Sequence, residues 1–225
     1  MNAVKEYFDI LKKCALFRNI EESDLGPMLH CLDAKIRKVS KNQPVFLEGE
    51  PAESVGIVLK GMAQIVKEDY YGNRSIVMGM EPSQLFGEAF ACAGLETMPV
   101  SIYAACDSVF LLVDCKRILN LCSNACTFHN RLVRNLLCVV AGKNLMLNQK
   151  MEVLSKKTTR EKLMTYLLAQ AKRQGNAAFT IPYDRQGLAD YLGVERSAMS
   201  AELGRMQKDG LLEYKKNYFK LSENY

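Results

Sequence analysis

The sequence has no tryptophan, only six prolines and only two histidines among its 225 residues. His30 and His129 are the only histidines, and no Ser/His/Asp motif of a hydrolase can be recognised around them. The sequence also has no phosphate-binding glycine loop and no Cys-X-X-Cys pair. No run of about eighteen apolar residues is present, and the N-terminus carries charges through its apolar positions. These absences argue against an enzyme, a membrane span and a signal peptide, and they favour a cytoplasmic protein.

Positive charge is concentrated in the last third of the chain. The net charge is +5, and residues 155–225 hold 13 basic against 8 acidic residues, so the whole excess lies there. Such asymmetry indicates a polyanionic partner for that region alone. The eight cysteines are expected to be free thiols, because disulfides are rare in a reducing compartment.

Residues 184–210 have the pattern of a helix-turn-helix. Asp184 can cap a first helix, and Gly193 can end it in the left-handed backbone conformation. The apolar residues of the two predicted helices recur at helical spacing: Leu188, Ala189 and Leu192, then Met199, Leu203 and Met206. Arg196 begins the exposed face of the second helix, where a recognition helix meets base edges.

An ordinary helical hairpin with a solvated charged face would show the same pattern. The residues that follow favour DNA binding, because 211–214 and 218–221 are strand-like runs on either side of a short basic turn. Together they predict a two-stranded wing with Lys215 and Lys216 at its tip, where winged helices contact phosphates.

The first part of the chain predicts a different architecture. Residues 1–32 are expected to be helical, whereas residues 34–114 consist of short runs rich in valine and isoleucine that are separated by turns. Many short strands with regular turns predict a small β-barrel or sandwich.

One long helix is predicted over residues 128–154, which contain no proline. Its seam alternates spacings of four and three: Val133, Leu137, Val140, Asn144, Leu147, Met151 and Leu154. A heptad seam with one polar Asn favours a parallel two-chain arrangement, and packing against its own domain is the alternative.

A β-roll, a long helix and a winged helix-turn-helix in this order resemble the CRP/FNR family of bacterial transcription regulators. The pieces that carry the resemblance are FLEGEPAESVGIVLKGMAQIV, LFGEAF, TTREKLMTYLL and RQGLADYLGVERSAMSAEL. The resemblance implies an α+β fold with a sensor domain at 1–127, a dimerisation helix at 128–154 and a DNA-binding domain at 155–225. It also implies a homodimer on palindromic double-stranded DNA, with RNA polymerase as the downstream partner.

In the members that bind cyclic AMP, a Phe-Gly-Glu turn holds the nucleotide and an arginine neutralises its phosphate. Gly87 and Glu88 match that turn, but the alignment places Met98 at the arginine and Pro99 at the serine beside it. No basic residue lies between Glu88 and Lys116. Because a buried phosphate without a charge-assisted donor loses its strongest contact, cyclic nucleotide binding is not expected.

The same comparison places Leu145 and Met146 where those members offer two hydroxyl side chains to adenine. The turn can therefore be a purely structural corner of the roll, or the cavity can take a different, apolar or aromatic effector. No cofactor is expected.

The cysteines leave one further possibility open. Cys122, Cys126 and His129 are spaced i, i+4 and i+7, so on a helix they would share one stripe and could bind a metal or respond to oxidation. Buried or idle thiols are the default, and only Cys14 and Cys31 lie near the N-terminus, where oxygen-sensing members carry an iron–sulfur cluster.

For the DNA interface, the family match puts Arg196 at the base-reading arginine, with Ser197 and Ala201 at two further recognition positions. The full predicted set is Arg185, Gln186, Arg196, Ser197, Ser200, Lys215 and Lys216. The sequence thus predicts an effector- or redox-responsive, dimeric, DNA-binding transcription regulator. The alternative is a ligand- or redox-sensing module without a specific DNA role.

Overall fold

The computed structural model describes residues 6–68, 74–120 and 127–222. The chain divides into two compact units, residues 1–141 and 142–225. The boundary falls within a long helix, α6 (Thr127–Ser155), which matches the single helix predicted over 128–154. None of the described helices is both long and apolar enough to cross a membrane.

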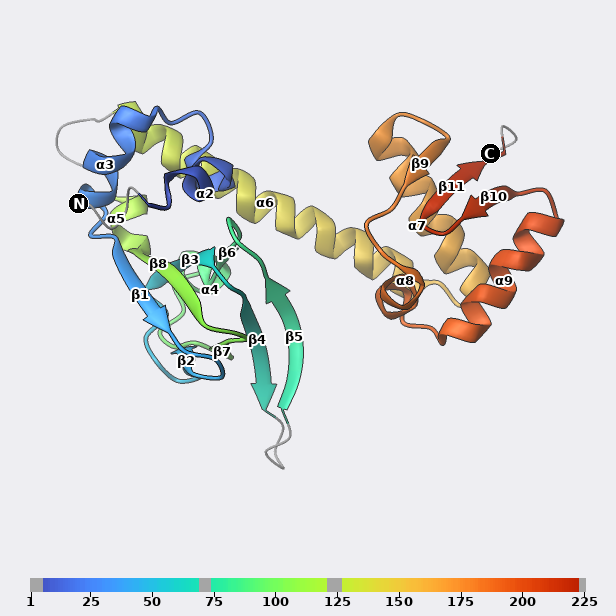
Figure 1. The fold of residues 1–225 in the computed structure, drawn as a ribbon, viewed down its shortest axis with the longest axis horizontal. Coiled ribbons are helices and arrows are strands. Elements are labelled where there is room, and N and C mark those ends of the chain that lie inside the picture. The colour runs from blue at the N-terminus through green and yellow to red at the C-terminus, as the bar shows by residue number, and fades with distance from the viewer. Residues whose placement is uncertain (1–5, 69–73, 121–126, 223–225) are drawn as a thin grey trace. The chain divides into compact units, whose positions relative to one another are not determined.

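The first unit is a β-roll with short helices (Figure 1). Its strands are β1 (Lys35–Val39), β2 (Pro44–Phe46), β3 (Ser54–Lys60), β4 (Ala63–Glu68), β5 (Arg74–Met80), β6 (Leu85–Phe86), β7 (Ser101–Ala104) and β8 (Ser108–Asp114). Its helices are α2 (Phe8–Lys13), the 3-10 helix η1 (Ala15–Phe17), α3 (Glu22–Cys31), α4 (Glu88–Cys92) and α5 (Cys115–Leu119). The β-rich region predicted over 34–114 is confirmed, and the helices α4 and α5 were not foreseen.

Two antiparallel four-stranded sheets, β1-β8-β3-β6 and β2-β7-β4-β5, form the roll. In β3, consecutive residues from Val55 to Leu59 are all buried because both faces of its sheet are covered. Val55 and Ile57 pack among the helices, whereas Val58 packs inside the roll. A strand buried on both faces reads as a continuous apolar run, which explains the sequence SVGIVL.

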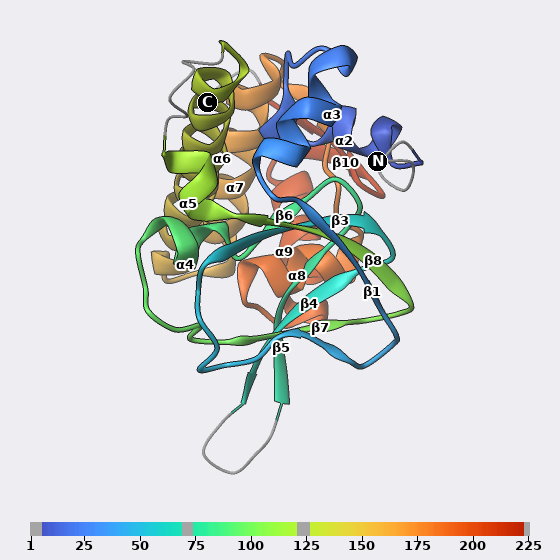
Figure 2. The ribbon, with the colours of Figure 1, turned by 90° about the vertical axis from the view of Figure 1, so that its left-hand side faces the viewer.

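Helices α2, α3 and α5 and the start of α6 gather at one end of the roll (Figures 1 and 2). Leu132 and Leu136 of α6 are buried in the core that these helices share with β3 and β8. The Asn135 amide donates to the carbonyl oxygens of Leu16 and Arg18 at 2.9 and 2.8 Å, which anchors α6 to η1. The first half of α6 is therefore part of the roll's own core.

The predicted heptad seam of α6 shares Val140 with the side of the helix that packs on this core, but most of the seam lies on another face. Leu137 and Met151 are 67% and 68% exposed, and Leu147 and Leu154 are exposed too. The helix does pack against its own domain, which was the alternative to a two-chain arrangement, and it does so through Leu132 and Leu136. Most of the seam is left uncovered in the single chain.

The second unit is a winged helix. It comprises α7 (Thr159–Gln174), β9 (Ala178–Thr180), α8 (Arg185–Leu192), α9 (Arg196–Lys208), β10 (Leu212–Lys215) and β11 (Tyr218–Leu221), after the end of α6. The wing was predicted as two strands, but its sheet has three in the order β10-β11-β9. Strand β9 spans three residues, which is too short for an alternating pattern to show.

Candidate nucleic-acid interface and sensor corner

The helix-turn-helix is built by three local signals. The Asp184 carboxylate accepts a hydrogen bond from the Gly187 amide at 2.7 Å and so caps α8. Gly193 ends α8 at a φ of 61°, a left-handed conformation that glycine adopts without a Cβ clash. Glu195 then caps α9 by accepting from the Ala198 amide at 2.9 Å. The two helices are thus separated by only three residues, 193–195.

The inner stripe of α9 sets which face remains outside. Met199, Leu203 and Met206 are fully buried in the core of the second unit, as the helical spacing predicted. Arg196, Ser197 and Ser200 are consequently exposed.

Four of the predicted DNA-binding residues surround one open depression of about 510 Å³ in the second unit. Arg185 and Gln186 come from the start of α8, Arg196 from the start of α9, and Lys216 from the β10–β11 turn. The complete lining is Pro182, Tyr183, Asp184, Arg185, Gln186, Arg196, Lys216 and Asn217. Three of these side chains are cationic and one is anionic, so the depression suits an anion.

Arg185 is held by aromatic rings. Its guanidinium lies over the rings of Tyr214 and Phe219, 4.6 and 5.5 Å from their centroids. Burial lowers the pKa of this guanidinium from its usual value, and the group stays charged at neutral pH because arginine's ordinary pKa is so high. Cation–π stacking therefore orders an arginine at the edge of the depression.

Hydrogen bonds orient several of the other predicted residues. The Gln186 amide donates to Asp190 at 2.8 Å, and the Ser200 hydroxyl donates to the carbonyl of Arg196 at 2.9 Å. Ser197 donates to the capping carboxylate of Glu195. Hydrogen bonds from Ser197 and Ala198 lower the pKa of the Glu195 carboxyl, so a negative charge stands beside Arg196.

The wing turn presents its lysines to solvent. Lys215 ends β10 and Lys216 follows at a φ of 54°, a left-handed conformation that is unusual for lysine. Asn217 secures the turn through two hydrogen bonds to Ile181. Its side-chain amide donates to the Ile181 carbonyl oxygen at 3.2 Å, and its backbone carbonyl oxygen accepts from the Ile181 backbone N–H at 2.9 Å.

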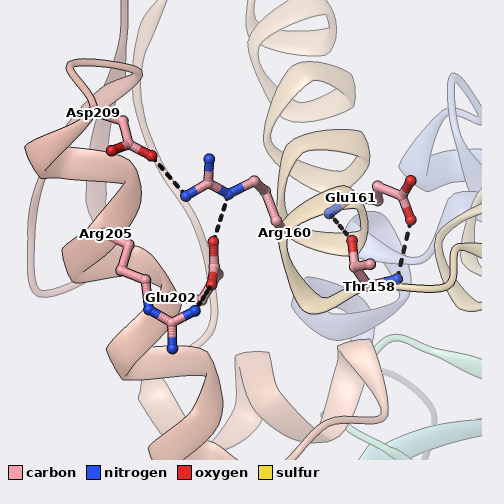
Figure 3. Close-up of polar contacts among 6 residues, drawn as sticks. All are labelled: Thr158, Arg160, Glu161, Glu202, Arg205 and Asp209. Carbon is pink, nitrogen blue, oxygen red and sulfur yellow. Dashed lines mark hydrogen bonds and ion pairs between the residues drawn. The ribbon is translucent and has the colours of Figure 1, made fainter.

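A charged network ties α7 to α9 (Figure 3). Arg160 of α7 donates to Glu202 at 2.5 Å and to Asp209 at 2.7 Å, and Arg205 donates to the second oxygen of Glu202 at 2.7 Å. The Glu202 side chain is only 10% exposed. A nearly buried carboxylate needs such partners, so this network fixes α9 against α7.

The same end of α7 carries a capping box (Figure 3). The Thr158 hydroxyl accepts from the Glu161 amide at 3.2 Å, while the Glu161 carboxylate accepts from the Thr158 amide at 3.0 Å. These bonds lower the pKa of the Glu161 carboxyl. The sequence signal Thr-X-X-Glu was available for this cap, whereas the pairing of Arg160 with Glu202 has no local signal.

In the β-roll, the predicted effector corner is tightly packed. Gly87, the residue just before α4, has a φ of 78°, and a Cβ there would lie 3.0 Å from the Ser54 carbonyl oxygen. Phe86 fills the roll interior against Phe46 and Phe110, with centroids 5.9 and 5.4 Å away. A Cβ on Gly56 would lie 2.1 Å from the Phe86 ring, so the ring can occupy this position only because residue 56 is a glycine.

The other predicted effector residues have different surroundings. Glu88 is buried, and Met98 is 2% exposed inside the roll core, whereas Pro99 is exposed. Leu145 and Met146 are exposed residues of α6 in the second unit. Met98, which the sequence comparison predicts to occupy the place of the phosphate-binding arginine, is thus an apolar side chain among apolar neighbours.

The predicted metal or redox stripe is only partly described. Cys122 and Cys126 lie outside the described residues. His129 is buried, and its Nε2 lies 2.9 Å from the Arg117 carbonyl oxygen, a hydrogen bond that links α6 to α5. Within the described part of the chain, no group of three or more His, Cys, Asp or Glu side chains could hold a metal ion.

Two sequence models of known domains match the chain. The cyclic nucleotide-binding domain matches residues 36–125, and the Crp-like helix-turn-helix domain matches residues 161–222. The chain has the domain pair of a CRP/FNR-type regulator. It is therefore a DNA-binding transcription regulator and not an enzyme.

Individual relatives of this CRP/FNR regulator share modest identity with it. The transcriptional activator protein FnrL of Cereibacter sphaeroides is 25% identical over 186 residues, covering 78% of this chain and 71% of the relative. The transcriptional activator protein FnrA of Stutzerimonas stutzeri is 28% identical over 189 residues, with 79% and 72% covered. The catabolite activator protein of Thermus thermophilus has a similar fold, with a TM-score of 0.53, 20% identity and coverage of 93% and 94%.

Proposed function

We propose that this CRP/FNR regulator binds a palindromic DNA site as a homodimer, with Arg196 reading a base in each half-site. The observation that carries the proposal is the convergence of Arg185, Gln186, Arg196 and Lys216 on one open depression. Arginine at the N-terminal end of an exposed helix can pair with guanine in the major groove through two hydrogen bonds.

The remaining predicted residues take supporting roles. Arg185, Gln186, Lys215 and Lys216 contact phosphates, and the stacking of Arg185 on Tyr214 and Phe219 supports a fixed contact. Ser197 and Ser200 lie on the exposed face of α9, the face that this proposal assigns to base contacts. Phosphate contacts position the protein on the duplex, and the base contacts select the sequence.

The dimer is proposed to form along α6. Its exposed seam holds Leu137, Leu147, Met151 and Leu154, and a second copy of the same helix would cover them. Asn144, exposed and bonded to the Asn148 amide at 2.9 Å, would fix the register of the pair. RNA polymerase is the downstream partner that the family resemblance implies.

The effector of the β-roll is proposed not to be a cyclic nucleotide. The support is Met98, which lies in an apolar core where a phosphate would require a cation. An apolar or aromatic effector is compatible with these surroundings. A thermal-shift screen against cyclic nucleotides and a metabolite library tests this. We expect no stabilisation by cyclic AMP or cyclic GMP, and a saturable rise of the melting temperature with either would refute it.

The DNA proposal is tested by selecting bound duplexes from a randomised pool with purified full-length protein at moderate salt. We expect enrichment of an inverted repeat whose half-sites lie about one helical turn apart. The Arg196→Ala variant, carried through the same selection, should lose the preference at one base pair per half-site. Enrichment of a single unpaired half-site would contradict the dimer. Retention of duplexes without any sequence preference would contradict base reading and favour a module that lacks a specific DNA role.

A further inference from the structure

Two thiols that lie far apart in the sequence meet between α4 and α5. The sulfur atoms of Cys92 and Cys115 are 3.7 Å apart, and the residues are 23 positions apart along the chain. Cys92 is the last residue of α4 and is partly exposed, whereas Cys115 is the first residue of α5 and is buried. Two sulfurs in van der Waals contact need only a small approach to reach bonding distance.

The surroundings of the pair determine how it can react. Burial raises the pKa of the Cys115 thiol to about 12, and it also raises the pKa of Cys92. Both groups are therefore protonated at neutral pH, and their reaction with an oxidant is slow, since the thiolate is the nucleophile. Cys92 is the more accessible thiol and is the one that an oxidant in solution reaches first.

We propose that Cys92 and Cys115 form a reversible intramolecular disulfide when the protein meets a peroxide. With hydrogen peroxide as the oxidant, the Cys92 sulfur attacks one oxygen and the O–O bond breaks. Cys92 becomes a sulfenic acid, and the displaced hydroxide leaves as water with the Cys92 thiol proton. The Cys115 sulfur then attacks the Cys92 sulfur, the S–O bond breaks, and a second water leaves with the hydroxyl and the Cys115 proton. The two sulfurs together lose two electrons, and the peroxide is reduced to two waters.

The position of the pair gives this modification a route to the rest of the first unit. Helix α4 begins at the Gly87–Glu88 corner, so Cys92 lies one short helix away from it. Helix α5 carries Arg117, whose carbonyl oxygen is hydrogen-bonded to His129 of α6. A disulfide would join α4 covalently to α5, which this hydrogen bond connects to the start of the long helix. It would restrain relative movement of the corner and α6.

Peptide mapping under non-reducing conditions tests the bond itself. Reduced full-length protein is treated with hydrogen peroxide, and the remaining thiols are alkylated. No Lys or Arg lies between Arg74 and Lys116, so trypsin leaves both cysteines in one peptide, and a protease that cuts after Glu96 is needed to separate them. We expect a cross-linked pair of peptides that contains Cys92 and Cys115, two hydrogens lighter than the sum, and that dithiothreitol separates.

Matched variants sharpen the result. Cys115→Ala should leave Cys92 as sulfenic or more highly oxidised acid without a cross-link, and Cys138→Ala, which removes an exposed thiol of α6, should leave the cross-link unchanged. Alanine replaces a buried cysteine with little change in packing. Cross-linking of Cys92 or Cys115 to any other cysteine would overturn the proposal. So would full alkylation of both while exposed cysteines such as Cys106 and Cys138 are oxidised.

A second readout concerns function and rests on the proposed DNA binding. Oxidation should change the affinity of the wild-type protein for its selected duplex, and the change should be absent in Cys115→Ala. An unchanged affinity despite a complete cross-link would refute control of DNA binding by this bond. Failure of the reduced protein to bind any duplex would count against the proposed function alone, because the peptide map reports the disulfide independently.

Discussion

The two units of this regulator differ in the kind of side chain that surrounds their predicted sites. In the winged helix, charged side chains stand exposed around a depression, on helices whose inner faces are fully buried. In the β-roll, the Gly87–Glu88 turn is present, and Met98, the residue predicted to stand at the phosphate position, lies in the apolar interior. Backbone turns persist because packing requires them, whereas ligand chemistry depends on a few side chains that can change without loss of the fold.

The comparison predicts that the corner of the roll serves packing. Phe86→Ala should lower the free energy of unfolding of the first unit by about 3–5 kcal/mol, because it removes a buried ring and leaves a cavity between Phe46 and Phe110. Urea unfolding followed by circular dichroism measures this. The exposed Glu96→Ala provides the control, with an expected change within about 0.5 kcal/mol. Equal stabilities of the two variants would contradict a packing role.

In the winged unit, by contrast, a substitution at the predicted site should weaken DNA binding and leave the stability unchanged. Arg196→Ala should weaken binding to the selected duplex by about 1–3 kcal/mol and relax specificity at one base pair per half-site, with stability unchanged. Fluorescence anisotropy on specific and random duplexes provides the measurement. Arg173→Ala removes an equal charge from a residue that does not line the depression, and it should affect both duplexes little. Equal losses on specific and random DNA for Arg196→Ala would remove it from base reading.

The charged network between α7 and α9 should have a smaller effect, on the stability of the second unit. Glu202→Gln should destabilise the second unit by about 1.5 kcal/mol, because two arginines lose a charged acceptor on a nearly buried side chain. Thermal unfolding measures the loss. The exposed Glu213→Gln on β10 is the matched control and should be neutral. If both substitutions give the same melting temperature, Arg160 and Glu202 do not hold α9 in place.

The smallest expected effect belongs to the wing. Lys216→Asn should weaken binding to all duplexes by the same factor and reduce the slope of log affinity against log salt by about 1. Asparagine is chosen because it tolerates the left-handed backbone at this position, where alanine would add strain. Lys216→Arg, which keeps the charge, should keep the slope. A sequence-dependent loss for Lys216→Asn would show that the wing reads bases.

Much of the architecture follows from local patterns in the sequence. The long helix, the caps at Asp184 and Gly193 and the buried stripe of α9 all depend on residues within a few positions of one another. Strand β9 and helices α4 and α5 escaped prediction because each is five residues or shorter and carries no clear period. The domain boundaries and the individual site residues remain predictions.

The sequence by itself determined the order of the domains, the α+β fold and the family, since apolar periodicity and turn residues act over short distances. Only the tertiary structure decided which side chains meet. It brought Arg160 to Glu202, stacked Arg185 on Tyr214, buried Met98 in the roll and placed Cys92 against Cys115. These contacts join residues 23 or more positions apart, and their partners are set by how helices and sheets pack, which no local pattern encodes.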